Sequence, residues 1–230
     1  MGSQLSTDVK QHEYWLRLIL ALEVHVTKAL LDVVHNRNND PSYRGIPELP
    51  VDLYNYLNQN FRQRFVNLLQ YNMLNQDQFY LLLPVNRHTD SSKWDITLTV
   101  VIIRTCVQIP QPRYGWNQVA PGDNSIAAGV IKARIFRNWM KHRKIDEVKT
   151  TTDFHVKWTE MNDVLICLHY NNIRKFKDLE TDDVLEGYIE EAKKVFADLV
   201  TKEIDQAKKD VLQKVMVDIV DLKAKVLKNG

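Results

Sequence analysis

Apolar side chains recur at steps of three and four residues along most of the chain, the spacing that places them on one face of a helix. In the first such stretch this face would carry Trp15, Leu18, Ile19, Leu22, Val26, Ala29, Leu30 and Val33. The chain has seven glycines and seven prolines. Because both residues disfavour a helix interior, their clusters at 41–50, at Pro84 and at 110–122 predict connections. The pattern therefore predicts an all-α fold.

Further helices are expected between these connections. The stretch from Leu53 to Leu82 should break into two helices near Asn75. Good N-cap residues precede the remaining apolar runs. They predict a helix over 94–107 after Ser91 or Ser92, one from 123–125 to about 142, and one after 151–153 that continues to 168. These helices would complete a bundle.

The run from Ile96 to Ile103 allows two interpretations. Its β-branched residues are typical of a strand by composition alone. The whole apolar stretch is about 14 residues long, however, and no partner strand is evident elsewhere in the sequence. We therefore expect a buried central helix here.

The last part of the chain, residues 181–229, has the composition of a long amphipathic helix. It has no proline and one interior glycine, and its narrow apolar stripe comprises Leu185, Tyr188, Ala192, Val195, Leu199, Ala207, Val211, Val215, Ile219, Leu222 and Val226. A continuous helix would be about 70 Å long. It would either fold back on its own bundle or pair as a coiled coil with another chain. We thus expect a tail over 1–11, a helical bundle over 12–177, and a connector or oligomerisation helix over 178–230.

The charge and cysteine content limit the class of protein. There are 31 Lys and Arg against 29 Asp and Glu, a formal net charge of +2, so any affinity for nucleic acid must come from a local cluster. Cys106 and Cys167 lie in apolar stretches, where cysteine is most often a small buried hydrophobe, and no Asn-x-Ser/Thr sequon occurs. These features predict a cytoplasmic protein.

No membrane span is expected, because no apolar run reaches the roughly 18 residues that one needs. The first six residues fit the M-G-x-x-x-S pattern for N-myristoylation, in which Gly2 would carry the lipid. The same start is also common in recombinant proteins. If Gly2 is lipidated, the protein would be peripheral to a membrane.

Common catalytic and metal-binding patterns are missing from the sequence. There is no glycine-rich phosphate loop, no nucleophile elbow, no His-x3-His pair and no Cys-x2-Cys pair. We therefore predict neither a metal site nor a cofactor. The sequence His88-Thr89-Asp90 is interpreted as a turn and helix cap rather than as a catalytic pair.

The helix expected to end near residue 142 has an unusual charge. Between 131 and 144 it contains no acid and six basic residues, Lys132, Arg134, Arg137, Lys141, Arg143 and Lys144. Arg137 falls on what would otherwise be the core-facing stripe of this helix. Ile131, Ile135 and Trp139 form a second apolar stripe. One side could pack within the protomer and the other against a second subunit.

Three residues near the end of this helix could act on a phosphodiester. Asn138 and His142 are four residues apart and share a face, and Arg137 precedes Asn138. A histidine can transfer a proton near neutral pH, a guanidinium can hold a phosphate, and an amide can orient either group. RNA carries its own nucleophile, the 2′-OH, so no metal-bound water is required. The plainer interpretation is a helix C-terminus that favours basic residues.

Five segments carry a resemblance to a known family. They are Lys93–Arg104, Tyr114-Gly115-Trp116, Pro121-Gly122-Asp123 with Ser125, Ile135–His142 and Trp158–Leu168. Together they resemble the HEPN superfamily, and within it the subgroup found in an animal RING-type ubiquitin ligase, the DAZ-interacting zinc-finger type. The resemblance is densest over 93–168 and extends by helix count back to about His12.

The resemblance implies an antiparallel helical bundle that often dimerises through the helix carrying the motif. Many members are metal-independent endoribonucleases with an Arg-x4-6-His motif, which Arg137, Asn138 and His142 match. Arg137 would hold the scissile phosphate and His142 would transfer protons. Asn138 would orient these two side chains. Arg137 and His142 are about 140° apart around the helix, so a site that uses both is more naturally assembled across a dimer.

Two hypotheses remain open at this point. The first is a homodimeric HEPN domain that binds or cleaves RNA, with Lys132, Arg134, Lys141, Arg143 and Lys144 along its groove. The second is a non-catalytic HEPN module that builds homodimers or higher homo-oligomers in a signalling or innate-immunity-like protein, with residues 181–229 as a coiled-coil element. Whether the protein is an enzyme is left open by the sequence.

Overall fold

The computed structural model describes residues 14–142 and 147–180, which form helices and loops and no β-strand. Residues 14–20 are helical and continue into a π-helical turn, η1 (Ala21–Val26). The remaining elements are α2 (Thr27–His35), α3 (Pro50–Gln70), α4 (Gln76–Leu82), a 3-10 turn η2 (Ser91–Lys93), α5 (Ile96–Cys106), α6 (Ile126–His142), α7 (Thr151–Cys167) and α8 (Ile173–Asp178). The all-α prediction is confirmed. The helix predicted over 181–229 lies outside the described residues.

Short polar side chains begin several of these helices. The break near Asn75 is confirmed, because Asn75 accepts a hydrogen bond from the Gln78 amide at the start of α4. The predicted start after Ser91 or Ser92 is wrong, since those residues form η2, and Asp95 caps α5 instead. The last long helix, α7, begins a few residues earlier than expected, because Thr150 is its cap.

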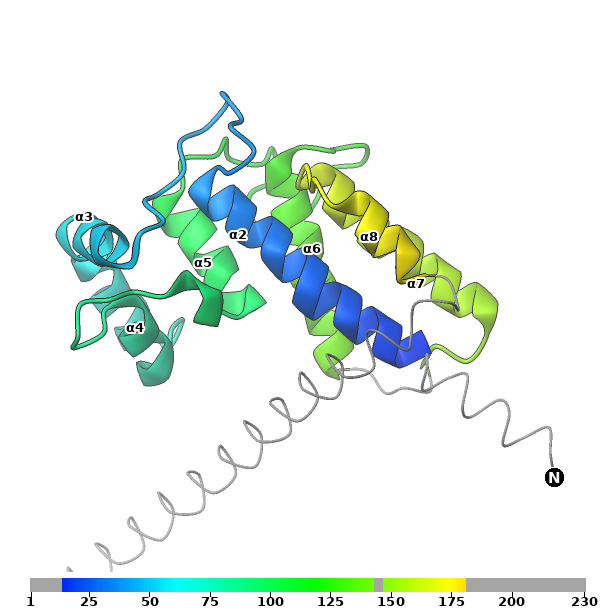
Figure 1. The fold of residues 1–230 in the computed structure, drawn as a ribbon, viewed down its shortest axis with the longest axis horizontal. Coiled ribbons are helices and arrows are strands. Elements are labelled where there is room, and N and C mark those ends of the chain that lie inside the picture. Colours follow the sequence, from blue (N-terminus) through cyan, green and yellow to red (C-terminus); the bar gives the residue numbers. More distant parts are fainter. Residues whose placement is uncertain (1–13, 143–146, 181–230) are drawn as a thin grey trace, which may run out of the picture. The chain divides into compact units, whose positions relative to one another are not determined.

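The apolar run that could have been a strand is the helix α5. Most of its side chains are buried, and it packs against α2, α3 and α6. Figure 1 shows α3 and α4 on one side of the molecule next to α5, with α7 and α8 on the other side of α2. A helix in this central place is buried on almost all sides, which explains its nearly continuous apolar sequence.

The helix α6 packs closely against α7. Near the start of α6, a Cβ atom at Gly129 would lie 2.8 Å from the Cβ of Cys167, so only glycine fits this contact. Near its end, the ring of Trp139 contacts Lys157 at the beginning of α7. The two helices are therefore antiparallel.

The short helix α8 was not predicted from the sequence. Its Phe176 is fully buried and stacks on Trp158, with ring centroids 4.4 Å apart and planes 6° apart. Arg17 donates to the carbonyl oxygens of Leu179, at 3.3 Å, and Glu180, at 2.6 Å. These contacts fasten the end of the described chain to the first helical stretch.

His25 lies in the π-helical turn and is buried. Its Nδ1 is 2.9 Å from the hydroxyl oxygen of Tyr170, and its ring meets Phe176 edge-on. Burial, with the positive charges of Lys28 and Lys175, lowers the pKa of His25 to about 4. The folded protein therefore holds this imidazole neutral.

This buried imidazole should make the stability of the protein depend on pH. An unfolded histidine titrates near pH 6.5, so between pH 6.5 and about 4 the unfolded chain binds a proton that the folded state excludes. The contribution is complete above this window and is lost as the pH falls through it, by about 2 kcal/mol between pH 7 and pH 5. Chemical denaturation at both pH values measures the difference. His25→Phe should remove most of it, and an undiminished pH dependence in that variant would contradict the assignment.

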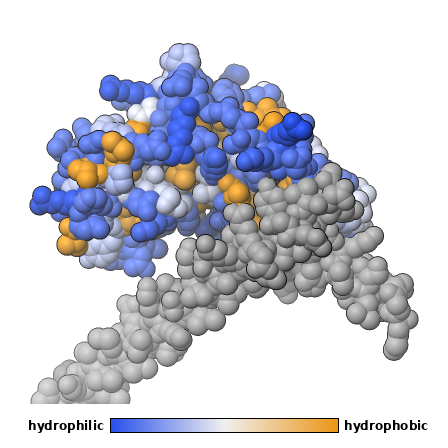
Figure 2. Space-filling view, in the orientation of Figure 1, coloured by the Kyte–Doolittle hydropathy of each residue, from blue (hydrophilic) through white to orange (hydrophobic). Residues whose placement is uncertain are grey.

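The surface is mostly hydrophilic, with separate hydrophobic patches on the face shown in Figure 2. Among the helices of the described ranges, none combines the length and apolar character needed to cross a membrane. Cys106 and Cys167 are free and buried, as expected. Burial raises the pKa of the Cys106 thiol, so this group is an unreactive part of the core.

Candidate functional site

The helix α6 changes character along its length. Residues 126–131 are all buried, and Ala133 and Phe136 extend this buried face. In the last turn, Lys141 and His142 are exposed. The start of α6 thus builds the core, and its end presents the predicted motif to solvent.

Arg137 is half-buried at the point where the core-facing stripe reaches the surface. Its Nη1 donates to the Oδ1 of Asn138 over 3.4 Å, a long hydrogen bond. No carboxylate in residues 14–142 or 147–180 forms an ion pair with it. Since a guanidinium has five N–H donors, Arg137 retains most of its capacity to hold an anion.

His142 is the last residue of α6 and is exposed. Its ring makes no hydrogen bond or ion pair with any residue that the structure describes. Asn138 lies one helical turn before it and is also exposed. No hydrogen bond joins Arg137 to His142 within the described protomer, as their angular separation predicts.

The predicted basic residues do not all share one environment. Lys132 is half-buried, and its Nζ lies 3.4 Å from the Sγ of Cys167. Lys141 is exposed. Arg134 donates from Nη2 to the backbone oxygen of Trp116 at 2.8 Å. Arg143, Lys144 and Gly2 lie outside the described residues.

The predicted second apolar stripe is only partly exposed. Ile131 is buried within the protomer, so this member of the stripe is not free to contact a second subunit. Ile135 is 50% exposed. Trp139 is half-buried, with its ring centroid 5.6 Å from that of Trp15 and 4.7 Å from the Nζ of Lys157. The apolar surface beside the motif is therefore narrower than the sequence pattern suggests.

A groove of about 280 Å³ runs between α6 and α7 next to this surface. Its lining comprises Lys132, Ile135, Phe136, Trp139, Lys157, Glu160, Asp163 and Val164. The α6 side contributes aromatic and basic groups, and the α7 side contributes both acids. A second protein chain could place apolar side chains here.

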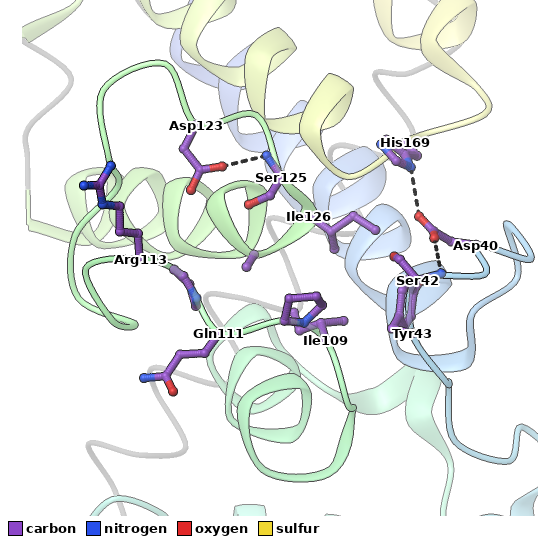
Figure 3. Close-up of a pocket in the computed structure, with 13 residues that line it drawn as sticks. Asp40, Ser42, Tyr43, Ile109, Gln111, Arg113, Asp123, Ser125, Ile126 and His169 are labelled. Atoms are coloured by element: carbon purple, nitrogen blue, oxygen red, sulfur yellow. Dashed lines mark hydrogen bonds and ion pairs between the residues drawn. The ribbon is translucent and has the colours of Figure 1, made fainter.

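A separate hollow of about 380 Å³ lies at the start of α6 (Figure 3). Two carboxylates line it: Asp40 pairs with His169 at 3.5 Å, and Asp123 accepts from the amide of Ser125 at 2.9 Å. About 24 Å of helix separates this end of α6 from His142. The hollow, which Arg113 and His169 also line, is therefore distant from the motif.

The loop after α4 has a structural role. Thr89 is buried and donates to the carbonyl oxygen of Leu82, and Asp90 accepts from the amide of Ser92. The turn-and-cap interpretation of His88-Thr89-Asp90 is confirmed. Over residues 14–142 and 147–180, no group of three His, Cys, Asp or Glu side chains could hold a metal ion.

The described residues thus form an antiparallel helical bundle, with Arg137 near the exposed end of α6 and His142 at it. Residues 50–193 match the DZIP3/hRUL138-like HEPN family, and the chain belongs to this family. The match includes the whole of α6. The resemblance inferred from the five sequence segments is thereby confirmed.

One relative is the human (Homo sapiens) E3 ubiquitin-protein ligase DZIP3. It is 25% identical to this chain over 114 residues, which are 49% of this chain and 9% of the ligase. The chain thus spans less than a tenth of the length of that protein. No solved structure matches the chain.

Proposed function

We propose that this protein is a metal-independent endoribonuclease that acts as a homodimer, with Arg137, Asn138 and His142 from two copies forming the site. The observation that carries the proposal is the state of Arg137, a half-buried guanidinium without a carboxylate partner among the described residues. Such a group is suited to bind an anion from outside the protomer, and a phosphodiester is the anion that the neighbouring histidine could act on.

The proposed reaction uses the 2′-OH of the RNA as nucleophile. A His142 imidazole accepts the proton of the 2′-OH as its oxygen bonds to phosphorus, and the bond from phosphorus to the 5′ oxygen breaks. The leaving 5′ oxygen takes its proton from a water molecule, and the His142 imidazolium returns the proton it accepted to the resulting hydroxide. Arg137 stabilises the charge that grows on the phosphate, and Asn138 orients it. The products are a 2′,3′-cyclic phosphate and a 5′-OH.

A mixing experiment tests whether two copies share the site. Arg137→Gln and His142→Ala should each cleave RNA far more slowly than the wild type. After the two variants are mixed and allowed to exchange subunits, a mixed dimer holds one site with its Arg137 and His142 both intact. Cleavage by the mixture, followed on a denaturing gel, should therefore exceed that of either variant alone. A mixture no more active than its parts would contradict a shared site.

A second candidate is a non-catalytic assembly module with the same fold. The exposed apolar side chains on α6 and α7, Ile135, Val156 and Ile166, favour it, because each is at least half exposed and Ile135 lines the groove between the helices. Under this alternative the wild type would form dimers in light scattering and leave RNA intact. We expect dimers and cleavage together.

A further inference from the structure

Two arginines from different helices converge on one aromatic residue of the loop between α5 and α6. The guanidinium carbon of Arg104, on α5, lies 5.7 Å from the centroid of the Trp116 ring. Arg134, on α6, donates from Nη2 to the backbone oxygen of Trp116 and, at 3.4 Å, to the Oδ1 of Asn117. Two like charges are therefore held on one small part of the surface.

These two charges are not neutralised by the protein. Burial and the positive charge of Arg134 lower the pKa of Arg104. No acid of the described ranges forms an ion pair with either guanidinium. Holding like charges together opposes folding. An anion that binds from outside the protein would offset this repulsion.

Aromatic rings beside the arginines indicate which kind of anion would bind there. Trp116 is half-buried, and Tyr114 is 51% exposed with the Arg113 guanidinium carbon 5.7 Å from its ring centroid. Unpaired nucleobases stack on such rings and on guanidinium planes, and arginines bind the phosphates between them. In a duplex the bases are already stacked on one another and paired, so they cannot stack on the Trp116 and Tyr114 rings.

The cluster is continuous with the motif along α6. Arg134 and Asn138 are four residues apart, and Lys141 and His142 follow one turn later, so they share one side of the helix. The rise from Arg134 to His142 is about 12 Å. A short length of single strand anchored at Trp116 can therefore reach His142.

We infer that Arg104, Arg134 and Trp116, with Tyr114 at the rim, form an anchoring subsite for single-stranded RNA that leads to the His142 end of α6. The inference rests on the proposed function, because it takes RNA as the ligand. It adds residues of α5 and of the loop before α6 to the RNA-binding surface, none of which belongs to the Arg-x4-His motif.

The test is fluorescence anisotropy with a labelled single-stranded oligouridine over a range of salt concentrations. Arg104→Gln should lower the affinity about 10-fold and reduce the slope of log affinity against log salt by about 0.7, the loss of one phosphate contact. Its thermal midpoint should not fall, because the substitution removes a repulsion. Tyr114→Leu should weaken binding of the single strand and leave the weaker binding of a duplex of equal length unchanged.

The matched control is Arg62→Gln. Arg62 is exposed on α3, and among the described residues its side chain bonds only to Asn58, one turn away, so this variant removes the same charge from another surface. Its affinity should stay within about twofold of the wild type. Equal losses in the two arginine variants would show an effect of net charge alone and overturn the inference.

A further comparison separates this subsite from the proposed function. If Arg104→Gln binds like the wild type and Arg137→Gln does not, the subsite is wrong and the proposed function stands. If the wild type itself binds no RNA, the proposed function fails and the subsite fails with it.

Discussion

Replacing His142 with alanine is expected to slow RNA cleavage by about 10²- to 10⁴-fold, the usual contribution of a general acid or base. The side chain is exposed at the end of α6 and makes no hydrogen bond with a described residue, so the fold should be unaffected. Initial rates on a labelled single strand in EDTA measure the loss. Thermal unfolding followed by circular dichroism checks the fold.

The matched control is His88→Ala, which removes another exposed imidazole. His88 lies in the loop after α4, where its Nδ1 is 2.7 Å from the backbone oxygen of Asn86. This variant should cleave at the wild-type rate. The catalytic assignment is wrong if His142→Ala also cleaves at that rate, or if both variants lose activity equally.

The largest expected effect on stability is that of Phe176→Ala, at about 3–5 kcal/mol. The Phe176 ring is fully buried between Trp158 and His25, and alanine would leave a cavity there. Because α8 has only six residues, it has little helical stability of its own. The helix α8 therefore depends on this ring to stay folded. Urea denaturation of the variant measures the loss in the free energy of unfolding.

Ile166→Ala provides the comparison on the neighbouring helix α7. Ile166 is 55% exposed, so its truncation should change the free energy of unfolding by less than about 0.5 kcal/mol. A cost below about 1 kcal/mol for Phe176→Ala would mean that α8 is not a part of the bundle core.

The helices with strong apolar periodicity could be predicted from the sequence. The residues at which they begin were harder to predict. Ser91, Ser92 and Asp95 can each cap a helix by the same local chemistry. Asp95 is the cap because Trp94, just before it, has an extended backbone that places its side chain in the core. Burial of a neighbouring side chain is a tertiary effect that no local pattern contains.

The short helix α8 was not predicted, for a related reason. The segment over 173–178 has a single buried apolar anchor, Phe176, too few for a periodic signal. Its partners, Trp158 and His25, are distant in sequence. Only the folded bundle brings the three rings together.

The candidate site was predictable as a set of residues on one helix but not in its surroundings. The charge pattern and the family resemblance both pointed to Arg137, Asn138 and His142. The sequence did not reveal that Ile131 is buried and Ile135 exposed, because both lie on the same apolar stripe. The convergence of Arg104 and Arg134 on Trp116 depends on a loop contact between helices, for which the Tyr114-Gly115-Trp116 sequence was the only signal.

The most direct test of the central claim is incubation of the wild type in EDTA with two labelled single strands of the same sequence. One is all RNA, and the other carries a single 2′-deoxynucleotide at the site cut in the first. We expect the RNA to be cut to products with a 2′,3′-cyclic phosphate and the substituted strand to stay intact at that position. An RNA left whole in EDTA, or equal cutting of both strands, would contradict a metal-independent endoribonuclease that uses the 2′-OH.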